Sequence, residues 1–368
     1  MSGWVEPDAL AVARTFGLGD RVESMRPVAG AWSNRVYRLT TDRGVFAVKQ
    51  LLNPWRDPRW SDWLDEAWRF ELAASEAAVP MPAPIPNSRD GGWRGDVMAA
   101  EGQQATAGPD ADSAGATAGR DASSYPGPGN DAGLVPVRVH RWVDGVPLVA
   151  GAVTRRTARW SGQVLATLHG LVVEPVDRTL FPQPDTVTAR RWPELVELAR
   201  HHHAAWAGQL AQAAGTVDAM AQLAEAAADR REDEVMSHGD LDQKNIILTA
   251  DAPVLCDWDV AAPVVPVREL AYVALSLAGW VRLDVARAAV DGYRDAGGSA
   301  TAAHPSDLGP RFMVGLDWIA FNVERAVGLH GATMQEAAAT NRLVPGLLER
   351  LPRQLDAGLR VVEVFCRR

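Results

Sequence analysis

Residues 237–248 read SHGDLDQKNIIL, and a second stretch, residues 254–259, reads VLCDWD. The first stretch contains Asp240 and, five positions later, Asn245, whereas the second contains Asp257. Two short runs of β-type residues lie between Asn245 and Asp257, and they predict a hairpin that folds the chain back on itself. We expect this hairpin to bring the three polar side chains to one cleft, although they are far apart in the sequence.

These three residue types suit phosphoryl transfer. The transferred group carries negative charge, and metal ions that bridge the phosphates neutralise much of it. Magnesium prefers hard oxygen ligands and takes one or two carboxylates from the protein, while a further carboxylate must orient the acceptor hydroxyl and take up its proton. We therefore predict Asp240 as the base, and Asn245 and Asp257 as metal ligands. The alternative interpretation is that Asp240 and Asp257 are only turn and cap residues.

His-Gly-Asp, four residues, Asn, a hairpin and Asp-Trp together resemble the aminoglycoside phosphotransferase and choline kinase family, whose fold is related to that of protein kinases. The protein-kinase counterparts are His-Arg-Asp with its Asn, and Asp-Phe-Gly. Residues 165–170, LATLHG, also resemble the helix that commonly precedes the catalytic segment in this family. The resemblance implies a bilobal, protein-kinase-like α+β fold, with a small β-rich N-lobe and a larger, mainly helical C-lobe.

The resemblance also implies a lysine that grips the α and β phosphates of the nucleotide. Residues 46–49, FAVK, are similar to the Val-Ala-Ile-Lys strand of kinases, so Lys49 is the candidate. A glutamate on the following helix would brace this lysine. We prefer Glu66, which lies at the family's usual interval before Pro80, and keep Glu71 as the alternative. Outside this context, each of these side chains reads as a solvated charge.

Residues 29–37, AGAWSNRVY, stand where the family has its phosphate-covering loop. The three-glycine form of protein kinases is absent, because only Gly30 remains. The stretch is similar to the phosphotransferase form, in which a Ser or Asn loop replaces the other glycines. Ser33 and Asn34 are therefore implied to lie at the β or γ phosphate.

The adenine is implied to bind at the hinge between the lobes. Residues 137–145, VRVHRWVDG, resemble that hinge, since a strand is followed by an Asp-Gly turn. Backbone groups of Arg141 and Val143 would pair with the adenine edge. The implied cofactors are ATP, or GTP, together with Mg²⁺.

Hydrophobic periodicity and turn residues predict the order of the elements. We expect the N-lobe to cover residues 1–140 and the C-lobe residues 141–368. In the N-lobe, a hairpin is predicted from two strands and the turn TDRG, followed by one helix. The C-lobe is predicted to be helical, with the catalytic hairpin between its helices. The expected segments are strands at 36–39, 45–48, 97–99 and 135–141, and helices at 60–78, 155–171, 191–229 (as one or two long helices), from 267, at 309–330 and at the C-terminus.

Residues 101–133 are mostly Gly, Ala, Ser, Asp and Pro, with almost no large apolar side chain. Such a stretch cannot bury enough surface to offset the entropy lost on ordering. We therefore predict a mobile insertion at about residues 101–134, between two strands of the N-lobe.

The acceptor pocket is expected among the C-lobe helices that face Asp240. Residues 316–325, LDWIAFNVER, combine carboxylates, an amide and aromatic rings on one helix. Asp317, Asn322 and Glu324 are the candidates for holding hydroxyls or amines. An amphipathic packing helix with an exposed polar face is the alternative interpretation.

Three more side chains are assigned through the resemblance. Asp259 follows the predicted metal ligand and stands where the family can have an acidic residue near metal or substrate. Glu269 stands where the family often has an Asp that anchors the catalytic loop, so we expect a structural role. His238 is expected to support that loop through a hydrogen bond rather than transfer protons.

Composition limits the remaining possibilities. The chain has 368 residues, of which 47% are hydrophobic, and its 46 acidic and 37 basic residues leave a net charge of −9. This charge disfavours nucleic acid as a partner, because binding a phosphate backbone needs a concentrated basic face. No signal peptide and no run of 18 apolar residues is found, so no membrane association is expected. With Cys256 and Cys366 as the only cysteines, we expect a cytoplasmic protein.

The sequence thus predicts an enzyme that moves the γ-phosphate of ATP to a hydroxyl of a small molecule. Its acceptor would be an aminoglycoside or other antibiotic, or else a primary metabolite such as an amino sugar, a choline-like alcohol or a homoserine-like acid. A non-catalytic nucleotide-binding regulator is the third hypothesis. It is disfavoured because Lys49, Asp240, Asn245 and Asp257 are all present. The oligomeric state is left open.

Overall fold

The computed structural model describes residues 5–28, 34–52, 58–100, 133–149, 151–181, 183–228, 233–300 and 302–366. The predicted insertion at 101–134 lies outside these residues except for its last two positions. The chain's internal contacts divide it into two units. The first unit comprises Met1–Ser75 and Met81–Asp144, and the second comprises Glu76–Pro80 and Gly145–Arg368.

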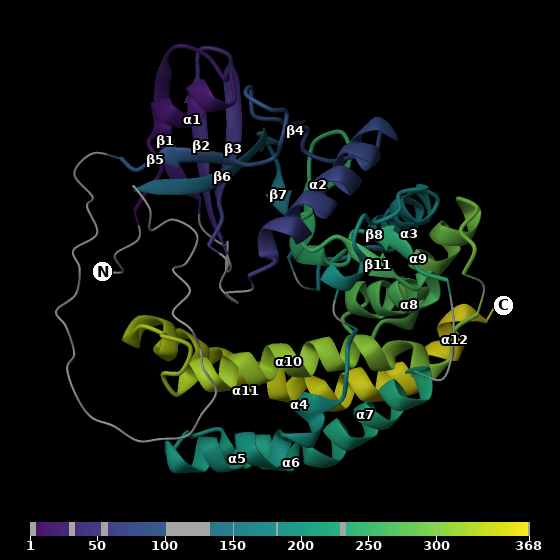
Figure 1. Ribbon diagram of the computed structural model, residues 1–368. Coiled ribbons are helices and arrows are strands. Elements are labelled where there is room, and N and C mark those ends of the chain that lie inside the picture. Colours follow the sequence, from purple (N-terminus) through teal and green to yellow (C-terminus); the bar gives the residue numbers. More distant parts are fainter. Residues whose placement is uncertain are drawn as a thin grey trace. The chain divides into compact units, whose positions relative to one another are not determined.

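The first unit is built on an antiparallel sheet (Figure 1). The predicted hairpin is present, with Thr41 paired to Gly44 across a two-residue turn. Gly44 has a φ of +132°, which an L side chain rarely adopts, so the turn depends on glycine. The strands follow the order β1-β2-β3-β6-β4, with β5 paired to β6. Their bounds are β1 Val22–Val28, β2 Arg35–Thr41, β3 Gly44–Gln50, β4 Pro84–Ile85, β5 Gly95–Met98 and β6 Leu134–Arg141.

The two faces of this sheet differ in chemistry, because successive side chains of a strand point to opposite sides. One face packs apolar side chains of β2, β3 and β6 against Val12 of α1 (Ala9–Thr15), a short helix that the sequence pattern did not reveal, and against Phe16, which follows it. Figure 1 shows α1 lying on the sheet. The other face carries Lys49 and Arg138, and Arg138 is paired with Glu71 of α2 (Trp60–Glu76).

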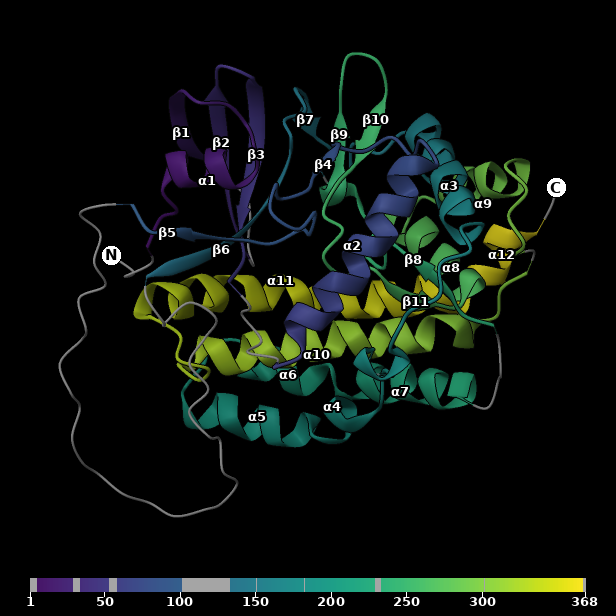
Figure 2. The ribbon, with the colours of Figure 1, turned by 45° about the horizontal axis from the view of Figure 1, so that its top comes forward.

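The second unit is mainly helical. Figure 2 shows its two long helices, α10 and α11, side by side, and they are in extensive contact. The helices are α3 Arg155–His169, α4 Val187–Arg190, α5 Trp192–His201, α6 Ala207–Gln212, α7 Ala214–Ala228, α8 Pro266–Leu277, α9 Leu283–Asp295, α10 Gly309–Ala326, α11 Met334–Leu359 and α12 Val361–Phe365. Among the described residues, no helix has the length and apolar character needed to cross a membrane.

Helices α3 and α9 approach each other unusually closely. A Cβ added at Gly162 of α3 would collide with the carbonyl oxygen of Ala289, and one added at Gly292 of α9 would collide with that of Arg159. Both glycines therefore allow backbone-to-backbone packing that no larger residue permits. This pairing fixes α3, whose last residue, His169, is hydrogen-bonded to Glu269 of α8 and Tyr293 of α9.

Short strands complete the second unit and carry that segment. β9 (Ile246–Leu248) lies between β10 (Pro253–Leu255) and β7 (Val146–Pro147), and β8 (Val235–Ser237) pairs with β11 (Ala262–Val264). The predicted catalytic hairpin is therefore present as β9 and β10.

The prediction of one or two long helices over residues 191–229 was wrong. The chain forms α5, α6 and α7 instead, and His203 adopts a left-handed φ of +52° just after α5. Tertiary contacts explain the breaks, since Trp192 Nε1 donates to the Leu210 carbonyl and Trp206 Nε1 donates to Asn341 Oδ1. The alanine-rich composition favours helix at every position, but packing decides where each helix ends.

Candidate active site

The hairpin of β9 and β10 brings two predicted metal ligands together. Ile246 pairs with Leu255, and the next hydrogen bond outward runs from the Cys256 N–H to the Asn245 carbonyl, at 2.9 Å. Asn245 and Asp257 therefore flank the open end of the hairpin. Asp257 has a positive φ of +69°, a strained conformation for a residue with a Cβ. Strain of this kind concentrates at functional sites.

Asp240 lies beside Asn245 and is surrounded by positive charge. Its Oδ2 is 2.9 Å from Lys244 Nζ and accepts a hydrogen bond of 3.1 Å from Asn245 Nδ2. Its Oδ1 is 3.2 Å from Nη2 of Arg311, which comes from α10. Burial by itself would raise the pKa of Asp240, but Lys244 and Arg311 outweigh burial and hold that pKa below its ordinary value. The carboxylate is therefore ionised and able to accept a proton.

The donor set suits a magnesium ion. Asn245 uses its Nδ2 to bond the carbonyl and the carboxylate of Asp240, so its amide oxygen is the atom left for a cation. Asp257 contributes a hard carboxylate. Within the described parts of the chain, no group of three or more His, Cys, Asp or Glu side chains could form a full metal cage. Magnesium fits such a sparse site, because it usually completes its shell with water and substrate phosphates.

Backbone requirements explain the glycine before Asp240. Gly239 has a φ of +74°, and a Cβ at this position would collide with the Val260 carbonyl. The Gly239 N–H donates to Glu269 Oε1 at 3.0 Å. Glu269 on α8 thus holds the loop directly, and the predicted structural role has a clear physical basis.

Glu269 is itself fixed from α3 and α9. His169 Nε2 donates to Glu269 Oε2 at 2.7 Å, while Nδ1 of His169 lies 2.9 Å from the Tyr293 hydroxyl. Burial would raise the pKa of Glu269, but the hydrogen bond and charge of His169 outweigh it, so the pKa lies below its ordinary value. The carboxylate is therefore ionised inside the unit.

His238 also supports the loop rather than the chemistry. Its Nδ1 accepts from the Asp240 backbone N–H at 3.3 Å, and its Nε2 lies 3.1 Å from the Cys256 carbonyl. Burial is the main influence on His238 and lowers the pKa of its ring. A neutral ring that accepts at Nδ1 and donates at Nε2 satisfies both contacts, and it ties Asp240 to the residue before Asp257.

The predicted nucleotide residues lie in the first unit. Lys49 stands on β3, where its partner across the sheet is Arg138 of β6. Asn34 closes the base of the hairpin, because its Oδ1 accepts from the Leu52 N–H at 3.2 Å. Ser33 lies outside the described residues. These positions do not test the predicted nucleotide contacts, which stay predictions.

Both candidate bracing glutamates are buried. Glu66 Oε2 is 2.7 Å from Arg69, whereas Glu71 pairs with Arg138 and, at 2.8 Å, with Nε2 of His140. The preference for Glu66 over Glu71 stays a prediction.

The proposed hinge residues follow the sheet. Arg141 ends β6, its backbone N–H donates to the Ala83 carbonyl at 2.8 Å, and its guanidinium lies over the Phe46 ring. Val143 lies two residues beyond β6, in the connection that leads to the second unit. The adenine contacts expected of Arg141 and Val143 stay predictions.

The acceptor residues predicted on α10 are mostly engaged with the protein. Asn322 is fully buried and donates to the Trp318 carbonyl. Glu324 pairs with His330 at 2.7 Å and with Arg191 at 3.5 Å. Asp317 is exposed, and its pKa is raised chiefly by partial desolvation. Asp259, two residues after Asp257, is half-buried.

Two residues in contact with Asp240 were missed by the sequence analysis. Lys244 lies within the quoted segment, and its spacing of four from Asp240 was the available signal. Arg311 lies 71 residues from Asp240, and no local pattern links the two.

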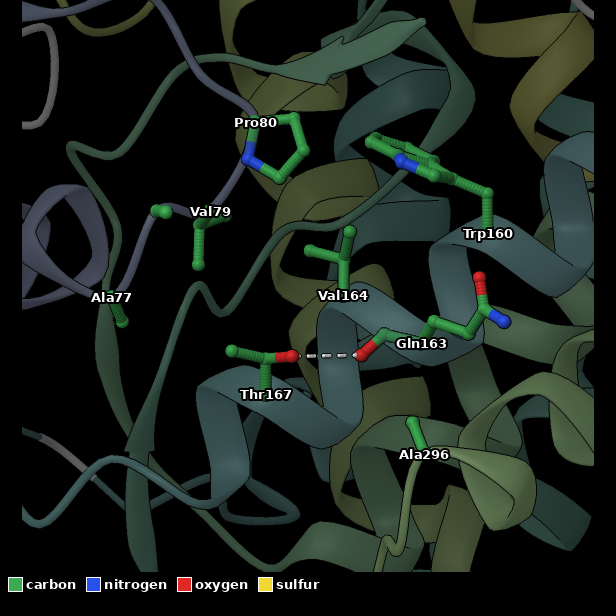
Figure 3. Close-up of a pocket in the computed structure, with 9 residues that line it drawn as sticks. Ala77, Val79, Pro80, Trp160, Gln163, Val164, Thr167 and Ala296 are labelled. Carbon is green, nitrogen blue, oxygen red and sulfur yellow. Dashed lines mark hydrogen bonds between the residues drawn. The ribbon is translucent and has the colours of Figure 1, made fainter.

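A separate cavity of about 290 Å³ lies in the second unit (Figure 3). Residues 77–80 and Ala296 line it together with Trp160, Gln163, Val164 and Thr167 of α3. In Figure 3, Thr167 is turned to its own helix, where its hydroxyl donates to the Gln163 carbonyl. None of the predicted site residues lines this cavity.

An antiparallel sheet followed by a helical unit with this hairpin and loop defines a protein-kinase-like fold, and the predicted α+β fold class is confirmed. Residues 24–305 match the model of the phosphotransferase enzyme family. The chain belongs to this family, which confirms the resemblance identified from the motifs. No curated protein matches the chain.

Solved structures share the fold at low sequence identity. A spectinomycin phosphotransferase in complex with ADP and spectinomycin is 10% identical, with a TM-score of 0.63 over 91% of this chain and 94% of that one. A microcompartment-associated aminopropanol kinase is 16% identical, with a TM-score of 0.57 over 96% and 98% of the two chains. An aminoglycoside phosphotransferase from Alicyclobacillus acidocaldarius is 13% identical, with a TM-score of 0.54 over 93% of each chain.

Proposed function

We propose that this protein transfers the γ-phosphate of ATP to a hydroxyl group of a small molecule. The observation that carries the proposal is the contact of Asp240 with Asn245, next to Asp257 at the open end of one hairpin. Membership of the phosphotransferase family supports the reaction class. ATP is favoured as the donor, because similar folds were solved with ADP and AMP-PNP.

Asp240 is the base in this proposal. Its carboxylate accepts the proton of the acceptor hydroxyl as that oxygen attacks the γ-phosphorus. The new O–P bond forms while the bond from the γ-phosphorus to the β–γ bridging oxygen breaks, and ADP leaves with that electron pair. Catalysis of this kind comes mainly from positioning and charge neutralisation.

Asn245 and Asp257 would hold Mg²⁺ through their side-chain oxygens. The bound ion would supply charge neutralisation for the phosphates. Lys49 would contact the α and β phosphates, with Glu66 or Glu71 as its brace. Ser33, Asn34, Arg141 and Val143 remain the proposed nucleotide-binding positions.

The acceptor is either an antibiotic or a metabolite. A spectinomycin phosphotransferase and an aminopropanol kinase share the fold, so the fold itself supports both alternatives equally. Asp259, Asp317, Asn322 and Glu324 remain the acceptor residues proposed from the sequence.

The test is a screen for ADP release over aminoglycosides, other antibiotics, amino sugars and small alcohols, using wild type and Asp240→Asn. A matched control is Asp251→Asn, which makes the same change at an exposed carboxylate in the loop between β9 and β10. We expect acceptor-dependent ADP release in wild type and in the control, and its loss in Asp240→Asn. Phosphate transfer at an unchanged rate in Asp240→Asn would rule out Asp240 as the base. Nucleotide binding without any transfer would instead support the regulator hypothesis.

A further inference from the structure

Arg311 contacts the proposed base, although it lies outside the family motifs described above. It enters from the first turn of α10 and reaches Asp240 Oδ1 with Nη2 at 3.2 Å. Its guanidinium lies 4.6 Å from the ring centroid of Tyr272 on α8, so an aromatic face fixes its plane. The side chain as a whole is 30% exposed.

Charges of both signs surround Asp240. One carboxylate faces two cations, Arg311 and Lys244, and the Lys244 side chain is 64% exposed. Two further carboxylates act on Lys244. One is Asp242, which already accepts hydrogen bonds from the Ser276 hydroxyl and the Lys244 N–H. The other is Asp257, the proposed magnesium ligand, whose charge the ion would offset. Arg311 and Lys244 are the two positive charges that an acidic group of the acceptor would meet at this base.

The contact geometry leaves Arg311 able to bind a second anion. A guanidinium has five N–H donors in a planar fork, of which Arg311 directs Nη2 to Asp240 and also hydrogen-bonds Tyr272, so that further donors remain. Within the described residues, Asp240 is the only carboxylate that pairs with Arg311. Carboxylate and phosphate groups match this fork, because two parallel hydrogen bonds form at once.

We propose that Arg311 binds an acidic group of the acceptor, so that the substrate class is hydroxyl compounds carrying a carboxylate or phosphate. This inference rests on the proposed function, because it takes Asp240 as the base beside which the acceptor hydroxyl lies. Arg311 orients the acidic group while Asp240 receives the hydroxyl proton. Tyr272, which lies beside the Arg311 guanidinium, is in edge contact with Trp280, with ring centroids 5.5 Å apart.

The test measures binding and needs no turnover. Wild type with ADP and Mg²⁺ is titrated with glycerate, glyceramide or 3-amino-1,2-propanediol, which differ only in an acid, an amide or an ammonium group. Glycerol 3-phosphate distinguishes phosphate from carboxylate recognition, and kanamycin represents the polycations. The readout is the rise in the melting temperature of the protein as the concentration of each compound increases. The variants are Arg311→Gln, Arg311→Lys, which keeps the charge but not the fork, and the control Arg325→Gln on the same helix.

We expect glycerate or glycerol 3-phosphate to stabilise wild type and Arg325→Gln, while the amide and the ammonium compound have little effect. A lost charge-assisted hydrogen bond corresponds to about tenfold or more in affinity, so Arg311→Gln should need about tenfold more ligand for the same shift. Arg311→Lys should need a ligand concentration between those of wild type and Arg311→Gln. It serves as the test variant if Arg311→Gln does not fold. Stabilisation by kanamycin instead, equal responses of wild type and Arg311→Gln, or no response to either acid would each overturn the proposal. Failure of phosphate transfer in the ADP-release screen would count against the proposed function but would leave this binding result standing.

Discussion

Removing the Glu269 carboxylate is the sharpest available test of how the catalytic loop is held. Each oxygen of Glu269 accepts one hydrogen bond, from the Gly239 N–H and from His169. A hydrogen bond to a charged group contributes about 1.5–3 kcal/mol, and breaking a buried ionic pair destabilises by about 3–5 kcal/mol. We therefore expect Glu269→Ala to lower the free energy of unfolding by about 3–5 kcal/mol, which for a unit of this size corresponds to about 10 °C in melting temperature.

Glu269→Gln separates the two contacts. The amide keeps an oxygen for Gly239 but loses the charge that faces His169, so a smaller loss of about 1–2 kcal/mol is expected. Urea unfolding followed by far-UV circular dichroism measures both losses. The control Glu363→Gln removes an exposed carboxylate paired with Arg360 and should change stability by less than about 0.5 kcal/mol. If Glu269→Ala loses less than about 1 kcal/mol, the buried carboxylate does not anchor the loop as argued.

The pH dependence of the same variants adds an independent check. The pKa of Glu269 in the folded state lies below its ordinary value of 4.5. Its stabilisation is therefore complete above the ordinary pKa and is lost as the pH falls through the folded-state pKa. The difference in unfolding free energy between wild type and Glu269→Gln should shrink below about pH 4.5, as expected from the ordinary pKa of a glutamate. A difference that grows on acidification would contradict this account.

Three further predictions follow from local geometry. Gly162→Ala would push a methyl group into the Ala289 carbonyl and should destabilise the second unit by about 1–3 kcal/mol in urea unfolding, whereas Gly208→Ala, which faces open space, should not. Thr333→Ala removes the N-cap of α11 and should lower the free energy of unfolding by about 1 kcal/mol, measured as a lower melting temperature. An unchanged melting temperature would show that the cap is dispensable. Asp257→Asn should raise the Mg²⁺ concentration needed for half-maximal ADP release, and an unchanged Mg²⁺ dependence would argue against its role as a ligand.

The sequence predicts the local parts of the site well and its long-range parts poorly. The hairpin between Asn245 and Asp257 was predictable, because β-type runs and their spacing are local signals. Arg311 was not, because it lies 71 residues from Asp240 and only the tertiary fold brings the two side chains together. The breaks among α5, α6 and α7 were missed for the same reason.

The register of the sheet in the first unit shows what each candidate brace for Lys49 would imply. Partners across an antiparallel pair project to the same face, so Lys49 and Arg138 share one face of the sheet. Glu71 reaches that face, because it pairs there with Arg138 and with His140, two positions further along the same strand. Its negative charge is therefore already shared between a guanidinium and an imidazole. Glu66 is buried too, and it forms an ion pair with Arg69 of its own helix, one turn away. A brace at Glu71 would thus make Lys49 part of a buried network with Arg138, whereas a brace at Glu66 would leave that network as a separate support for the sheet.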